Sequence, residues 1–188
     1  PVGMFNITDQ NLTGLPEENQ KLVCDFTINY NNVPINFAVP VFYRITDPVD
    51  GEVYKPVVIT PPVTVNIEKD IYFFSSDMDK EIKISVQSFK NSVSGKIILD
   101  SKDGWKVEPS QIVFQFDKFN QKKDYYVKVT PSTNGSTSEL SAQSIIDNKT
   151  FTKSLTRIEY KHILPQTIFY ETKSKLELFN FNKDGVKK

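Results

Sequence analysis

The sequence predicts an all-β protein: an immunoglobulin-like antiparallel β-sandwich preceded by a smaller β unit. Short segments in which apolar and polar residues alternate recur between residues 63 and 159, at about the ten-residue spacing typical of such sandwiches. Prolines and asparagines separate these segments, as expected at strand ends and turns. No stretch keeps the i, i+3, i+4, i+7 apolar pattern of an amphipathic helix. We therefore expect strands and almost no helix.

The first part of the chain, residues 1–58, is expected to form a small or incomplete β domain. Residues 22–30 and 35–45 alternate as two strands. The segment 31–34, Asn-Asn-Val-Pro, predicts the turn between them, because Asn tolerates positive φ and Pro ends strand pairing. Pro40 has no N–H to donate, so it predicts an edge strand or a bulge.

Residues 46–62 are expected to be a loop and a stiff connector, because three prolines fall within residues 56–62. Beyond this boundary we expect the immunoglobulin-like sandwich over residues 59–165. Its predicted strands are 63–67, 71–74, 82–86, 94–99, 112–116 and 125–130, followed by a hairpin of 137–146 with 150–159 around Asp147-Asn148-Lys149. Residues 166–188 are expected to be a strand and a linker towards a C-terminal domain that this chain lacks.

The amino-acid composition argues against two classes of binding partner. The 188 residues include 23 Lys and Arg and 23 Asp and Glu, so the net charge is zero with His neutral. Nucleic acids and anionic membranes attract concentrated positive charge, so we expect neither as a partner. No apolar run approaches the ~20 residues of a membrane span. Because the chain opens on Pro1 rather than Met, we expect a piece of a longer protein whose signal peptide lies elsewhere.

Groups that carry chemistry are few. Cys24 is the one cysteine, and it alternates with Leu22, Phe26 and Ile28, so we expect a buried, inert thiol. His162 is the one histidine and is expected to be structural. A zinc site needs three or four His, Cys or carboxylate ligands. The sequence therefore predicts no catalytic residue, no metal site and no cofactor.

Three aromatic residues are candidates for glycan contact. Trp105 has two interpretations: a core residue of the sandwich, or an exposed platform that stacks on a sugar ring. Tyr125 and Tyr126 are adjacent in a predicted strand, so they must point to opposite faces of it. One of the two tyrosines should therefore face solvent.

Four short sequence motifs occur in the same order here as in a family of bacterial proteins. They are residues 41–56 (VFYRITDPVDGEVYKP), 61–65 (PPVTV), 104–109 (GWKVEP) and 160–167 (YKHILPQT). Together they resemble the region beyond the catalytic domain in large bacterial PIG-L (LmbE-like) deacetylase family proteins of the Bacteroidetes. The motif 104–109 also resembles Ig-like domains that accompany some bacterial glycosidases.

The resemblance covers roughly residues 40–188 and implies a parent protein that is a zinc-dependent N-acetylglucosaminyl deacetylase-like hydrolase. In that family a His-Pro-Asp-Asp motif and a later His hold the zinc, and a domain with a glutamine-amidotransferase-like fold follows. The His-Pro-Asp-Asp motif is absent from this sequence. The resemblance therefore assigns the deacetylase activity to another part of the parent protein.

We thus expect a non-catalytic Ig-like accessory or spacer region of a multidomain bacterial protein that acts on N-acetylglucosamine-type glycans. The expected location is the periplasm, the envelope or the cell exterior, and the expected partners are flanking domains of the same chain. The alternative is a carbohydrate-binding module that uses exposed aromatics at Trp105, Tyr125 and Tyr126. Aromatics on one surface would favour binding, whereas aromatics confined to the core would favour spacing.

Overall fold

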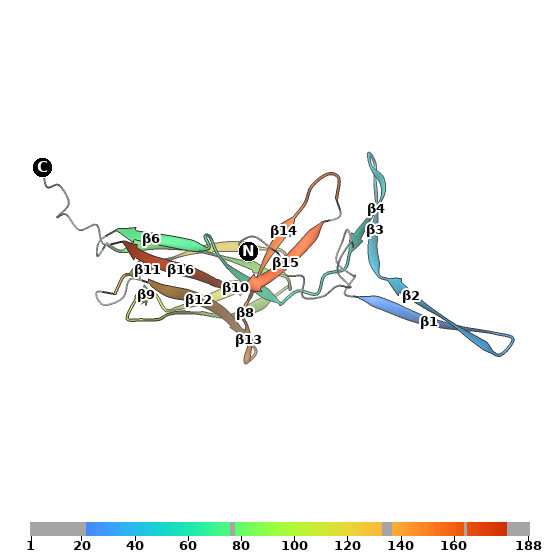
Figure 1. Ribbon diagram of the computed structural model, residues 1–188, viewed down its shortest axis with the longest axis horizontal. Coiled ribbons are helices and arrows are strands. Elements are labelled where there is room, and N and C mark those ends of the chain that lie inside the picture. Colours follow the sequence, from blue (N-terminus) through green and yellow to red (C-terminus); the bar gives the residue numbers. More distant parts are fainter. Residues whose placement is uncertain (1–21, 76–77, 133–136, 164, 180–188) are drawn as a thin grey trace, which may run out of the picture. The chain divides into compact units, whose positions relative to one another are not determined.

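The computed structural model describes residues 22–75, 78–132, 137–163 and 165–179. Figure 1 shows strands throughout and no helix in these residues, so none of them could span a membrane as a helix. The chain divides into two compact units. One contains the residues up to Val58 together with 159–165, and the other contains 59–158 together with the residues from Gln166 onwards.

The first unit begins with a β-hairpin. Strand β1 (Val23–Tyr30) pairs antiparallel with β2 (Val33–Pro40). Asn31 and Asn32 form the two-residue turn with φ values of 48° and 64°, as a type I′ turn requires. The turn at Asn31-Asn32 is confirmed, and its two positive φ angles explain why asparagines stand there. The predicted turn was too long, because Val33 and Pro34 already belong to β2 and pair with Tyr30 and Asn29.

A second hairpin follows, and here two predictions were wrong. The expected strand 35–45 ends at Pro40, and a new strand β3 (Phe42–Asp47) pairs with β4 (Gly51–Pro56). Much of the expected connector 46–62 is therefore a hairpin. Pro40 still pairs with Val23, and the Val41 amide donates to the Leu22 carbonyl at 3.0 Å before the chain turns into β3. The backbone amides of residues 49 and 50 both donate to the Asp47 carboxylate, which closes the turn of the second hairpin.

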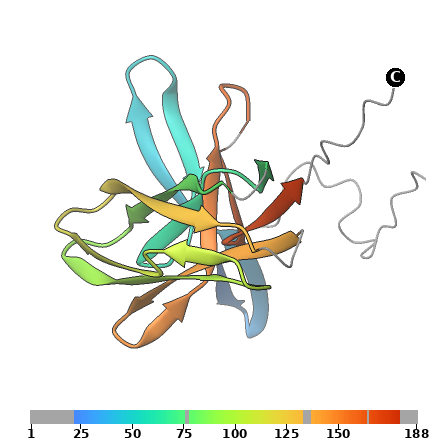
Figure 2. The ribbon, with the colours of Figure 1, turned by 90° about the vertical axis from the view of Figure 1, so that its left-hand side faces the viewer.

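The second unit is a sandwich of two sheets, which confirms the predicted fold class (Figure 2). The four-stranded sheet has the order β5-β7-β11-β9 and the six-stranded sheet has the order β10-β8-β12-β16-β6, with β13 beside β12. The first order matches the A-B-E-D sheet of an immunoglobulin fold, and β8-β12-β16 match C-F-G. The strands are β5 (Val63–Ile67), β6 (Ile71–Ser75), β7 (Lys80–Ser88), β8 (Val93–Ser101), β9 (Lys106–Glu108), β10 (Gln111–Phe116), β11 (Lys122–Thr130), β12 (Thr137–Ile146), β13 (Lys149–Phe151) and β16 (Lys173–Phe179).

The core lies between the two sheets. Strands β7 and β10 bury every second residue, as alternation predicts for a sheet with one solvated face. The largest fully buried side chains come from both sheets: Phe74, Phe114, Phe116, Ile82, Ile84, Ile97, Leu140 and Leu176.

The predicted hairpin near residue 147 is only partly correct. Asp147 and Asn148 form its turn, with φ values of 48° and 61°, but β13 pairs with β12 over three residues only. The chain then leaves the sheet and forms a separate hairpin of β14 (Lys153–Ile158) with β15 (Gln166–Glu171). Strand β16 follows within the six-stranded sheet, where it pairs with β12 and, in parallel, with β6. The rest of the expected linker, residues 180–188, lies outside the described residues.

The chain passes through the sandwich from one end to the other. Strand β5 begins at Val63, opposite Ser88, and β16 ends at Phe179, opposite Ser75. Strand β5 runs antiparallel to β7, from Val63 at Ser88 towards Ile67. The chain then crosses to the six-stranded sheet as β6, which pairs in parallel with β16 as far as Ser75. Ser88 and Ser75 therefore mark opposite ends. We name the end at Val63 and Ser88 the proximal pole and the end at Ser75 and Phe179 the distal pole. Nine-residue β7 spans this length, which corresponds to about 30 Å.

Candidate functional site

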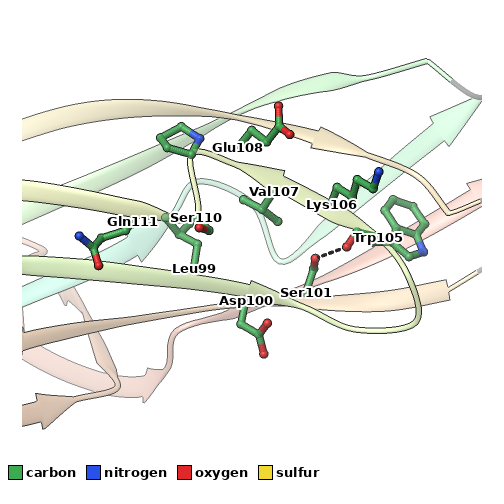
Figure 3. Close-up of a pocket in the computed structure, with 10 residues that line it drawn as sticks. Leu99, Asp100, Ser101, Trp105, Lys106, Val107, Glu108, Ser110 and Gln111 are labelled. Atoms are coloured by element: carbon green, nitrogen blue, oxygen red, sulfur yellow. Dashed lines mark hydrogen bonds between the residues drawn. The ribbon is translucent and has the colours of Figure 1, made fainter.

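A hollow of about 630 Å³ lies at one edge of the sandwich, open to solvent (Figure 3). It forms where the chain crosses from the four-stranded sheet to the six-stranded sheet. Strand β9 pairs with β11 in one sheet, the Glu108–Pro109 peptide bond is cis, and β10 then pairs with β8 in the other sheet. The hollow is lined by Leu99, Asp100, Ser101, Trp105, Lys106, Val107, Glu108, Pro109, Ser110 and Gln111.

Trp105 lies at this hollow as a packed residue. It is 4% exposed, and the ring of Phe74 meets it edge to face with centroids 4.9 Å apart. The Ser101 hydroxyl donates to its carbonyl oxygen at 2.8 Å (Figure 3). Its indole Nε1 is buried and has no hydrogen-bond partner among the described residues. Of the two interpretations of Trp105, the structure therefore shows the core residue and not the exposed platform.

The two tyrosines point to opposite faces of β11, as predicted. Tyr125 packs against the core, and its partial burial raises the pKa of its hydroxyl. Tyr126 is 57% exposed on the outer face, opposite Lys83 of β7. The three candidate glycan-contact residues thus lie in three different environments: the interior, the inner face and the outer face. They do not form one aromatic surface.

The outer face around Tyr126 carries paired charges. The Asp124 carboxylate accepts from the Ser85 hydroxyl at 2.7 Å and lies 3.1 Å from the Lys83 ammonium, and these contacts lower its pKa. On the same face, hydrogen bonds from Lys128 and Thr130 lower the pKa of the Asp79 carboxyl. These carboxylates are stabilised as anions, which disfavours a role as general acids near neutral pH.

A second, charged hollow lies near the distal pole, and sequence reasoning missed it. Glu139 lies 3.3 Å from the Lys173 ammonium and 3.8 Å from that of Lys102. Lysines and acidic residues both line the hollow, so their charges largely offset one another. The lining residues are Asp70, Lys102, Asp103, Thr137, Ser138, Glu139, Lys173, Ser174 and Lys175. Only the strand register brings these residues together, so no local sequence pattern marks them.

Cys24 is exposed, so the prediction of a buried thiol was wrong. The alternation correctly placed it on an apolar face of β1, but within the described residues β1 pairs only with β2. His162 is exposed in the loop between β14 and β15. Among the residues that the structure describes, no cluster of three or more His, Cys, Asp or Glu side chains could hold a metal ion.

Comparisons with known proteins leave the family open. No model of a known protein family matches the chain. No curated protein matches it either. Among solved structures, it is similar to a family 123 glycoside hydrolase from Clostridium perfringens, studied for glycolipid glycan hydrolysis. The identity is 10% and the TM-score 0.33, over 64% of this chain and 28% of that chain. None of these comparisons supports the resemblance to PIG-L deacetylase family proteins.

Proposed function

We propose that this chain is a non-catalytic Ig-like accessory region that spaces the flanking parts of a longer multidomain protein. One observation carries the proposal: the chain enters the sandwich at the proximal pole, at Val63, and leaves it at the distal pole, at Phe179. Sequence continues on both sides of these residues. A module with this path holds the preceding and the succeeding parts of the chain about 30 Å apart.

The proximal pole is anchored by hydrogen bonds. The amide of Phe89 donates to the Pro62 carbonyl at 2.7 Å, which holds the incoming chain against the turn after β7. Ser88 is fully buried, and its hydroxyl faces the carbonyls of Lys90 and Lys118 at 3.0 and 2.9 Å. Buried and satisfied polar groups rigidify a site, which a spacer requires.

The sequence motifs are the basis for proposing which kind of parent protein contains this spacer. Residues 41–56, 61–65, 104–109 and 160–167 support a parent protein of the PIG-L deacetylase type that acts on N-acetylglucosamine-type glycans in the periplasm or outside the cell. In this proposal the zinc-dependent chemistry belongs to another domain, and the flanking domains of the same chain are the partners.

Carbohydrate binding is the second candidate function, and it rests on Tyr126 alone, since Trp105 and Tyr125 pack inward. A glycan array with the wild-type chain and Tyr126→Ala separates the two functions. Spacing predicts no glycan signal that depends on Tyr126. A signal lost in Tyr126→Ala would favour binding.

The test of spacing measures the distance between the poles. In a Cys24→Ser background, dyes on Lys90→Cys and Phe179→Cys mark the proximal and distal poles. Single-molecule energy transfer should give one narrow population at a separation of about 30 Å or more. Several distances, or a broad distribution, would contradict a rigid spacer.

Activity in the parent protein provides the functional readout. Replacing residues 59–179 by a flexible Gly/Ser linker of equal length should lower turnover of polymeric glycans and spare small acetylated substrates. Equal losses on both substrates would argue against spacing. Acetate release by this chain alone would overturn the non-catalytic assignment.

A further inference from the structure

The β1–β2 hairpin has one apolar face and one polar face. The apolar hairpin face consists of every second residue of β1 from Cys24 to Tyr30 and of β2 from Val33 to Val39. All eight side chains are apolar or a thiol, and none is charged. The opposite face carries Asp25 and a hydrogen bond from Thr27 Oγ1 to Asn36 Oδ1 of 2.9 Å.

The apolar hairpin face exposes a larger continuous apolar area than scattered surface residues would. Its large side chains have exposed fractions between 43% and 68%. With about 150–200 Å² for each of these seven side chains, the face presents roughly 550–750 Å² of contiguous apolar surface. That lies at or above the upper end of the ~300–600 Å² of the largest patch on a typical monomer and approaches the ~800 Å² that each partner buries in a stable complex.

The register makes this face self-complementary. Phe26 lies opposite Phe37, and Ile28 lies opposite Ile35, so the two central rows across the hairpin each pair identical side chains. A second copy, related by a two-fold axis parallel to the strands, would place phenylalanines over phenylalanines and isoleucines over isoleucines. No like charges oppose this packing, because the face has no charge.

From this area and symmetry we propose that the apolar hairpin face is a homodimer interface, on which a second copy of this chain packs face to face. The two hairpins then form a small sandwich with its sheets about 10 Å apart. An isolated two-stranded hairpin is marginally stable in water, and the second copy supplies the apolar layer that it lacks.

The test is the mass of the 188-residue chain in solution from low to high micromolar concentration, by light scattering and sedimentation velocity. Wild type should shift reversibly from monomer to dimer. Phe37→Lys should weaken the dimer by about tenfold or more, because it buries an unpaired charge at the interface centre. Its neighbour Asn36 lies on the polar face of the same strand, so Asn36→Lys is the matched control and should dimerise as wild type does.

A second variant tests whether Phe37→Lys weakens the dimer only because it unfolds the hairpin. Ile28→Thr with Ile35→Thr keeps β-branched side chains that favour strands but removes apolar contact, so it should also weaken the dimer. The Cys24 thiol reports on the interface directly, and its alkylation should slow as the wild-type concentration rises. A monomer at every concentration, with alkylation independent of concentration, would overturn the proposal. So would a dimer that Phe37→Lys leaves intact.

Discussion

The side chain of Asn66 pairs with the backbone of Leu155 as a neighbouring strand would. Its Nδ2 donates to the Leu155 carbonyl oxygen at 2.8 Å, and its Oδ1 accepts from the Leu155 amide at 3.3 Å. Asn66 belongs to β5 and Leu155 to β14, 89 residues later in the chain. One amide side chain thereby ties the β14–β15 hairpin to the sandwich.

Replacing Asn66 should release this hairpin locally. Asn66→Ala removes both hydrogen bonds, at a cost of about 0.5–1.5 kcal/mol for each bond. Amide hydrogen exchange at Leu155 should accelerate while exchange in β7 stays slow. Asn66→Asp replaces the donor with a carboxylate oxygen that faces the Leu155 carbonyl oxygen, so exchange at Leu155 should be at least as fast as in Asn66→Ala. Unchanged exchange at Leu155 in both variants would show that the two Asn66–Leu155 hydrogen bonds do not hold the β14–β15 hairpin in place.

Trp105 should be a major contributor to the stability of the sandwich. Trp105→Ala should cost about 3–5 kcal/mol in the free energy of unfolding, because it empties a site packed against Phe74. Trp105→Phe should cost less, since it keeps a ring and removes an indole N–H that lacks a partner. Denaturant unfolding measures both values. Exposed Tyr126→Ala is the control and should change stability by less than about 0.5 kcal/mol. An equally small loss for Trp105→Ala would refute the packing role.

Gly95 should not tolerate a side chain. A Cβ at this position would lie 2.4 Å from the Ile145 carbonyl oxygen and 2.9 Å from the ring of Phe114. Gly95→Ala must therefore push β12 or β10 away from β8, at a cost of about 1–3 kcal/mol. Ser94→Ala, one residue earlier on the exposed face, should be close to neutral. A Gly95→Ala variant as stable as wild type in thermal unfolding would show that the strands separate easily.

The outer face of the four-stranded sheet should lose stability in acid. Hydrogen bonds lower the pKa of Asp79 and of Asp124 from the ordinary value of 3.8. A group with a lowered folded-state pKa stabilises the fold above its unfolded pKa, and the contribution is lost as pH falls through the folded pKa. The thermal midpoint should therefore fall as pH drops below about 3.8.

Variants isolate this acid effect. Asp79→Asn with Asp124→Asn should flatten the decline of the thermal midpoint below this pH. Exposed Asp100→Asn, in the other sheet, is the control and should leave the decline unchanged. A decline as steep in the double variant as in wild type would assign the acid sensitivity to other groups.

Local sequence patterns determined much of the strand content and the direction of several side chains. Alternation placed Tyr125 and Tyr126 on opposite faces, and the two asparagines before Val33 marked a hairpin turn. These features depend on backbone geometry over a few residues, and neighbouring residues suffice to encode it.

Tertiary structure alone decided the pairing between strands and which faces are covered. Alternation put Cys24 on an apolar face, but the absence of a covering layer among the described residues leaves that face exposed. The parallel pairing of β6 with β16 and the tie from Asn66 to Leu155 join residues about a hundred positions apart. Such contacts depend on how distant segments meet in three dimensions, so the periodicity of any one segment cannot specify them.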